Sequence, residues 1–162
     1  MRYFLDTEFN GWGGALLSLA LVPAIGDQEF YVTLNCDQPI EPWVQRNVVP
    51  FLDMVPAHLR SERLNRSQAA IELQSWLKRE DDYRLSSSNS ASEPLELFTD
   101  WPEDISQFCN LLIVGPGHCV EVPPLSFRMV PIPGFSSAAN SQVPHNALHD
   151  ARALRDQFEA MR

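Results

Sequence analysis

Two carboxylates lie two residues apart near the start of the chain, in the stretch Arg2–Phe9. The run Tyr3-Phe4-Leu5 has no polar alternation, which predicts a strand buried on both faces. Side chains alternate along a strand, so Asp6 and Glu8 should point to the same side, roughly 7 Å apart. Burying two like charges together is costly unless a positive charge lies between them. The pair therefore indicates a divalent metal site.

Two later stretches carry the other candidate residues. Asp104 lies in the first turns of a helix predicted over residues 101–112, at the edge of its buried face. The last helix follows Pro144-His145-Asn146-Ala147-Leu148-His149-Asp150. If Asn146 caps that helix, His145 lies on the preceding loop. Asp150 then falls in or near the first turn and leans toward the sheet.

Four carboxylates from three distant stretches, with a histidine on a loop, fit two-metal phosphoryl chemistry. Hydrolysis of a phosphodiester needs an activated water and a stabilised leaving oxygen, and two cations roughly 3.5–4 Å apart can provide both. Oxygen ligands suit Mg²⁺ or Mn²⁺, and the absence of a cysteine cluster argues against zinc. A histidine with an ordinary pKa of about 6.5 can take the proton of the attacking water.

The surrounding pattern predicts an α/β domain with a mixed sheet, spanning residues 1–162 as one unit. Three strands joined by short glycine turns form an antiparallel meander. Acids, serines and Asn89 between Asp81 and Ser92 predict a loop. The other expected elements are strands at Ala15–Val22, Glu29–Leu34, Leu95–Phe98 and Ser126–Val130, and helices from Pro42, from Asn65 or Ser67, over Trp101–Leu112 and from Asn146. The apolar faces expected for the last two helices consist of Trp101, Ile105, Phe108 and Leu112, and of Ala147, Ala151, Leu154, Phe158 and Met161.

The totals restrict the class of protein. A net charge of -9 disfavours a protein that grips duplex DNA through many phosphates. Three scattered cysteines without CxxC spacing indicate reduced thiols in a cytosol-like compartment. No apolar run has the length of a membrane span, and no signal peptide is recognisable. These features predict a cytoplasmic protein that does not enter a membrane.

Together the motifs resemble a known family, the DEDDh 3′–5′ exonucleases, which have the RNase H-like fold and include the RNase T, oligoribonuclease and replicase proofreading types. The resemblance rests on Asp6-Thr7-Glu8, on Asp104, and on His145 with Asp150 in an H-x4-D arrangement. It is closest to a compact bacterial and phage branch of 3′–5′ exoribonucleases, through Phe4–Phe9, Glu41–Pro50 and Pro144–Leu148. The resemblance spans nearly the whole chain.

The resemblance implies roles by position. Asp6, Glu8, Asp104 and Asp150 would hold two Mg²⁺ or Mn²⁺ ions, and His145 would be the general base. The implied substrate is the 3′ end of single-stranded RNA, and a homodimer is possible.

The implied substrate-binding residues are Thr7, inside the first acid motif, and Phe9, Asn10 and Gly11, which follow that motif where relatives contact the terminal nucleotide. The second motif departs from the aromatic-Asp pair of many relatives, since the chain reads Trp101-Pro102-Glu103-Asp104. Asp100 and Glu103 therefore compete with Asp104 for its role. Asp104 is preferred because Asp100 more naturally begins the helix.

Two other functions stay open from the sequence. The first is the same chemistry on single-stranded DNA, because no residue that reads a 2′-hydroxyl can be named. The second is a non-catalytic nucleic-acid-binding module, which the net charge disfavours. The four tryptophans are expected to be packing residues rather than base-stacking platforms, least firmly for Trp12, which lies in the loop beside Phe9.

Overall fold

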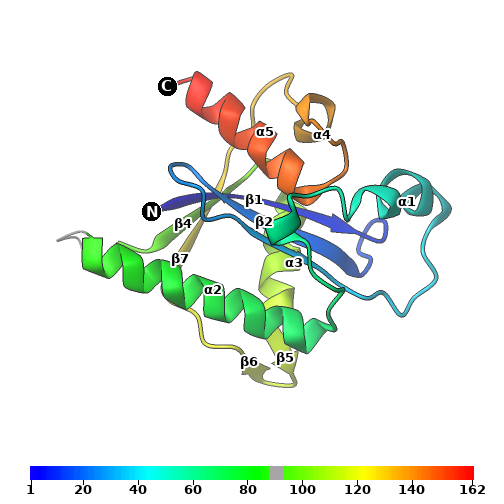
Figure 1. Cartoon of the computed structure of the whole chain (residues 1–162), viewed down its shortest axis with the longest axis horizontal. Helices are drawn as coiled ribbons and strands as arrows, with labels where there is room; N and C mark the ends of the chain where they lie inside the picture. The colour runs from blue at the N-terminus through cyan, green and yellow to red at the C-terminus, as the bar shows by residue number, and fades with distance from the viewer. Residues whose placement is uncertain (88–92) are drawn as a thin grey trace.

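A five-stranded mixed sheet forms the centre of the protein (Figure 1). The structure is a computed structural model and describes residues 1–87 and 93–162. The strand order is β3-β2-β1-β4-β7. The first three strands pair antiparallel, and β4 and β7 run parallel to β1. The predicted antiparallel meander and the predicted α/β domain with a mixed sheet are both confirmed. The strands are β1 (Arg2–Phe9), β2 (Leu16–Pro23), β3 (Phe30–Thr33), β4 (Leu95–Thr99) and β7 (Leu125–Met129).

Helices cover both faces of this sheet, which explains why the central strands lack polar alternation. Helices α2 (Arg66–Ser87) and α3 (Pro102–Leu112) lie on one face, and α5 (Ala147–Ala160) lies on the other (Figure 1). Every residue of β2 is buried. The larger core joins β1 to α2 and α3, while Ala147, Leu148 and Ala151 pack α5 onto β2.

Short elements complete the chain. Helix α1 (Pro42–Asn47) is followed by two 3₁₀ turns, η1 (Val49–Phe51) and η2 (Ala57–Leu59). A small hairpin of β5 (Ile113–Gly115) and β6 (His118–Cys119) follows α3, and α4 (Ser137–Asn140) precedes α5. Within the described ranges, no helix combines the length and the apolar character that crossing a membrane requires.

The predicted loop from Asp81 was wrong over its first half, because α2 continues to Ser87. Arg84 is buried on this part of the helix and donates to Asp81 Oδ1 at 2.7 Å, one turn earlier. An i,i+3 pair of this kind stabilises a helix. The rest of the predicted loop, residues 88–92, lies outside the described residues. At the other end, Asn65 caps α2 by accepting from the Gln68 N–H at 2.9 Å.

The apolar stripes predicted for the last two large helices were partly wrong. Trp101 is the N-cap of α3 and is exposed, and the buried face of α3 consists of Asp104, Gln107, Phe108 and Leu111. Polar side chains occupy that face because they find partners there: Gln107, for example, donates to the Gly14 carbonyl at 3.0 Å. Met161 is the C-cap of α5 and is exposed rather than part of the core.

Candidate active site

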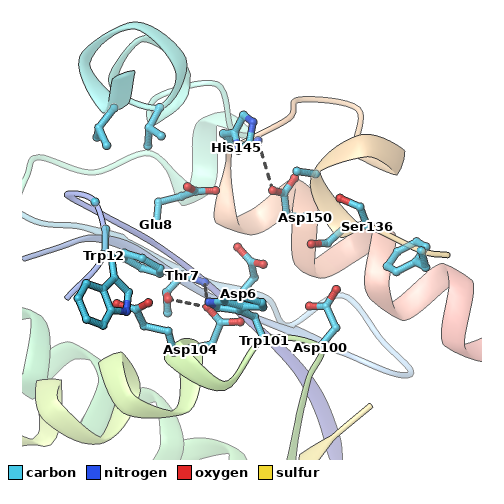
Figure 2. Close-up of a pocket in the computed structure, with 18 of the residues that line it drawn as sticks. Asp6, Thr7, Glu8, Trp12, Asp100, Trp101, Asp104, Ser136, His145 and Asp150 are labelled. Atoms are coloured by element: carbon cyan, nitrogen blue, oxygen red, sulfur yellow. Dashed lines mark hydrogen bonds between the residues drawn. The ribbon is translucent and has the colours of Figure 1, made fainter. Parts of the chain in front are cut away.

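A cavity of about 910 Å³ lies where β1 and β4 end and where α3 and α5 begin (Figure 2). Parallel strands bring their carboxyl ends to one edge of a sheet, and helix N-termini gather at the same edge. The described lining includes the predicted acids and histidine, namely Asp6, Glu8, Asp104, His145 and Asp150. The fold therefore brings together five predicted residues that are separated by up to 144 positions in the chain.

Asp6 and Glu8 point into this cavity from β1 (Figure 2). Asp6 is only 7% exposed, and no hydrogen-bond donor among the described residues contacts its carboxylate. Burial raises the pKa of Asp6 well above its ordinary value, and the carboxylates of Asp104, Asp150, Glu8 and Asp100 raise it further. Burial also raises the pKa of Glu8, with Asp150 and Asp104 adding to the effect. The pair lacks the positive partner that two buried carboxylates require.

Asp104 is 2% exposed and is held by hydrogen bonds from both parallel strands. Its Oδ1 accepts from the Thr7 N–H at 3.1 Å and the Thr7 hydroxyl at 2.7 Å. Its Oδ2 accepts from the Thr99 hydroxyl at 2.7 Å. Burial raises the pKa of Asp104 to about 7, although these hydrogen bonds act in the opposite direction. Asp104 thus fixes the start of α3 against β1 and β4.

The loop before α5 sets the position of His145. Asn146 is the N-cap, and its Oδ1 accepts from the backbone N–H groups of Leu148 and His149 at 3.1 and 3.3 Å. Its amide donates to the Phe51 carbonyl at 2.7 Å. His145 has a φ of 60°. This left-handed backbone conformation is uncommon for residues other than glycine, and residues in such strained conformations cluster at functional sites. The predicted cap is confirmed, and it leaves His145 outside the helix.

Asp150 contacts the backbone of His145, and Trp43 contacts its side chain. The backbone N–H of His145 donates to Asp150 Oδ2 at 3.2 Å (Figure 2). The imidazole packs edge-on against the Trp43 indole, with ring centroids 5.0 Å apart and an interplanar angle of 81°. Burial lowers the pKa of His145, which favours the neutral imidazole that can accept a proton near pH 7.

The ligand atoms form two groups suited to cations. Glu8, His145 and Asp150 offer ligand atoms within 4.8 Å of one another, and so do Asp6, Asp100 and Asp104. Buried oxygens of two of these acids, Asp150 Oδ1 and Asp100 Oδ1, have no hydrogen-bond partner. The described lining of the cavity includes no lysine or arginine. Carboxylate oxygens without a positive partner fit Mg²⁺ or Mn²⁺.

The structure distinguishes Glu103 from Asp100 and Asp104, the three candidates for the metal ligand of the second motif. Asp104 and Asp100 both belong to the group around Asp6. Glu103 also lines the cavity, but its Oε1 accepts from the Gly13 N–H at 2.9 Å. From the sequence, Asp104 is preferred to Asp100 as the metal ligand of the second motif. The signal that favours Asp100 is its position directly after β4, at the edge of the sheet where the cavity lies.

The predicted substrate residues divide into two kinds. Thr7, Phe9 and Gly11 line the cavity. Asn10 is 6% exposed and does not: its Oδ1 accepts from the Glu41 N–H at 2.8 Å, and its amide donates to the Pro39 carbonyl at 3.0 Å. Asn10 therefore fixes the loop to the start of α1.

Three of the four tryptophans are not packing residues, contrary to the expectation. Trp12, Trp43 and Trp101 are 94%, 50% and 57% exposed, and all three line the cavity. Only Trp76, at 5% exposure, belongs to the core. Large aromatic faces around a cavity that also contains carboxylates offer stacking surfaces for unpaired bases.

Comparisons with known proteins give similarity at the level of overall structure. No family model matches the sequence, and no curated protein matches it. Among solved structures, the chain is similar to "Exonuclease X in complex with 5′ overhanging duplex DNA", with 15% identity, a TM-score of 0.46, and coverage of 99% of this chain and 92% of that one. We draw no functional conclusion from a match at this level.

Proposed function

We propose that this protein is a metal-dependent 3′–5′ exonuclease that removes nucleotides from the 3′ end of single-stranded RNA. One observation carries the proposal: the four acids and the histidine of the DEDDh-like motifs meet in one cavity, in two groups of ligand atoms that each span at most 4.8 Å. The fold alone would not suffice, because one fold supports many activities.

Asp6, Glu8, Asp104 and Asp150 would hold the cations. Within the part of the chain that the structure describes, Asp6 has no donor near its carboxylate, and one oxygen of Asp150 is buried without a partner. Both would gain from a positive charge at this place. When bound, a pair of Mg²⁺ or Mn²⁺ ions supplies an activated water and charge stabilisation for an in-line displacement at phosphorus.

His145 is the proposed general base. It is the one histidine lining the described part of the cavity, and the lowered pKa keeps the imidazole neutral near pH 7. In the proposed reaction the water proton passes to His145, the water oxygen bonds to phosphorus, and the bond to the 3′ oxygen of the preceding nucleotide breaks. The products are a nucleoside 5′-monophosphate and a chain shortened by one nucleotide. The hydrogen bond from the His145 backbone to Asp150 keeps the base beside the acids.

Exposed aromatic side chains support an unpaired substrate end. Trp12, Trp43 and Trp101 surround the acids, and bases of a single strand can stack on such faces. A duplex would offer mainly phosphates, which the net charge of -9 disfavours. RNA rather than DNA is proposed from the resemblance of Phe4–Phe9 and Glu41–Pro50 to the exoribonuclease branch.

A nuclease assay on matched substrates tests the proposal. Single-stranded RNA, single-stranded DNA and duplex of one sequence are incubated with protein in Mg²⁺, Mn²⁺ or EDTA. The expected result is degradation of single-stranded RNA with either cation, with none in EDTA and none by Asp150→Asn. Faster degradation of single-stranded DNA than of single-stranded RNA would make DNA the substrate instead of RNA. Inactivity on all three substrates would refute the proposal.

A further inference from the structure

Asp100 is a fifth carboxylate in the cavity, in addition to the four that the motifs select. It follows the last residue of β4, and its ligand oxygen lies within 4.8 Å of those of Asp6 and Asp104 (Figure 2). Its Oδ1 is buried, and no hydrogen-bond donor among the described residues contacts it.

We propose that Asp100 is a direct ligand of the cation held by Asp6 and Asp104. This inference rests on the proposed function for the presence of that cation. It gives the site five acidic ligands instead of four. Two of them lie close together in the chain: Asp100 directly after β4 and Asp104 in the first turn of α3.

The hydrogen bonds of Asp104 explain why this position needs another carboxylate. A carboxylate oxygen has two lone pairs, and both on Asp104 Oδ1 are used by the Thr7 N–H and hydroxyl. Oδ2 accepts from Thr99 and keeps one lone pair. Asp104 can therefore give a cation a single coordination position, whereas Asp100 Oδ1 has no competing donor.

Asp6 supplies independent evidence that a cation belongs here. Its side chain is 93% buried, since its exposed fraction is 7%, and it points into the cavity without a donor among the described residues. Asp6, Asp100 and Asp104 then form a group of three acids with no positive side chain in the lining. Such a group is stable in the ionised state only with a bound cation.

Glu103 provides a matched control. It lies three residues after Asp100, lines the same cavity and carries the same charge, but it is outside both groups of ligand atoms. Its carboxylate accepts from the Gly13 N–H. Glu103→Gln and Asp100→Asn thus each remove one negative charge from the cavity, but only Asp100→Asn removes a proposed ligand.

Titration calorimetry of Mn²⁺ into metal-free protein tests the inference without any nuclease assay. Asp100→Asn should weaken Mn²⁺ binding at least roughly tenfold, as removal of a group that tunes a metal site typically does. Asp6→Asn should weaken it at least as much, and Glu103→Gln should leave it within about twofold of wild type. Wild-type Mn²⁺ affinity in Asp100→Asn, with Asp6→Asn impaired, would overturn the inference.

Melting in EDTA separates a ligand from a structural residue. Asparagine has nearly the size and shape of aspartate and removes a like charge, so Asp100→Asn should melt at or above the wild-type temperature when no metal is present. Lower stability with unchanged Mn²⁺ affinity would assign Asp100 a structural role and overturn the inference. A protein that binds Mn²⁺ through Asp100 but degrades no nucleic acid would instead refute only the proposed function.

Discussion

The acid cluster should make the metal-free protein less stable as the pH rises, and Asp6→Asn should reverse this. The pKa values of Asp150 and Asp104 are raised from 3.8 to about 6 and about 7, and that of Asp6 is raised well above 3.8. A carboxyl with a raised pKa in the folded state binds its proton more tightly than in the unfolded chain. Its stabilising effect is present below pH 4 and is lost as the pH rises through about 6 to 7.

The distances of the site give the magnitude for Asp6. At an effective dielectric constant of about 20, two unit charges 4.8 Å apart repel by about 3 kcal/mol. Relief of one such repulsion in Asp6→Asn corresponds to a rise of roughly 6–12 °C in Tm for a domain of this length. The gain should shrink toward pH 4, because Asp6 is then protonated in the folded state and no longer repels its neighbours.

Thermal unfolding in EDTA and in Mn²⁺, at pH 8 and pH 4, measures these effects. Wild type should gain Tm with Mn²⁺ at pH 8, because a cation that binds only the folded state stabilises it, while Asp6→Asn should gain little. Glu72→Gln, which removes an exposed acid on α2, is the control for net charge and should change neither value. Lower stability of Asp6→Asn than of wild type in EDTA at pH 8 would refute the reasoning.

Three further substitutions test single residues of the site. His145→Ala should lower kcat by about 10²–10⁴-fold, as removal of a general base does, with Mn²⁺ affinity nearly unchanged in calorimetry; a large loss of affinity would make His145 a ligand instead. Trp12→Ala should raise KM by roughly 5–150-fold, from about 1–3 kcal/mol of stacking, and should not change Tm because the side chain is 94% exposed; an unchanged KM would exclude stacking on Trp12. Asn146→Ala should destabilise the fold by about 1 kcal/mol or more, since it removes the cap of α5 and the bond to Phe51, and urea unfolding at wild-type stability would contradict that role.

The first and last motifs could be predicted because local rules decide them. Alternation along β1 is enough to point Asp6 and Glu8 the same way, and the structure places both in the cavity. An Asn cap is enough to leave His145 on the loop and Asp150 in the first turn. Neither inference needs knowledge of a distant partner.

Partners distant in sequence decide the features that were missed. The buried face of α3 includes Asp104 because Thr7 and Thr99, from two other elements, satisfy its carboxylate. A stripe of apolar residues therefore misplaced the helix face and predicted that Trp101 would be buried. Asp100 was ranked below Asp104 because it was expected to begin the helix, whereas Trp101 is the N-cap of α3. The nearness of Asp100 to Asp6 appears only when β4 lies beside β1.

Product analysis on an RNA labelled at either end tests the central claim most directly. With Mn²⁺ and wild-type protein, a 5′-labelled single strand should shorten one nucleotide at a time. A 3′-labelled strand should release a labelled nucleoside 5′-monophosphate at once, and EDTA should stop both reactions. Internal cuts, release first from the 5′ end, or cleavage that persists in EDTA would contradict a cation-dependent 3′–5′ exonuclease built on Asp6, Glu8, Asp104, His145 and Asp150.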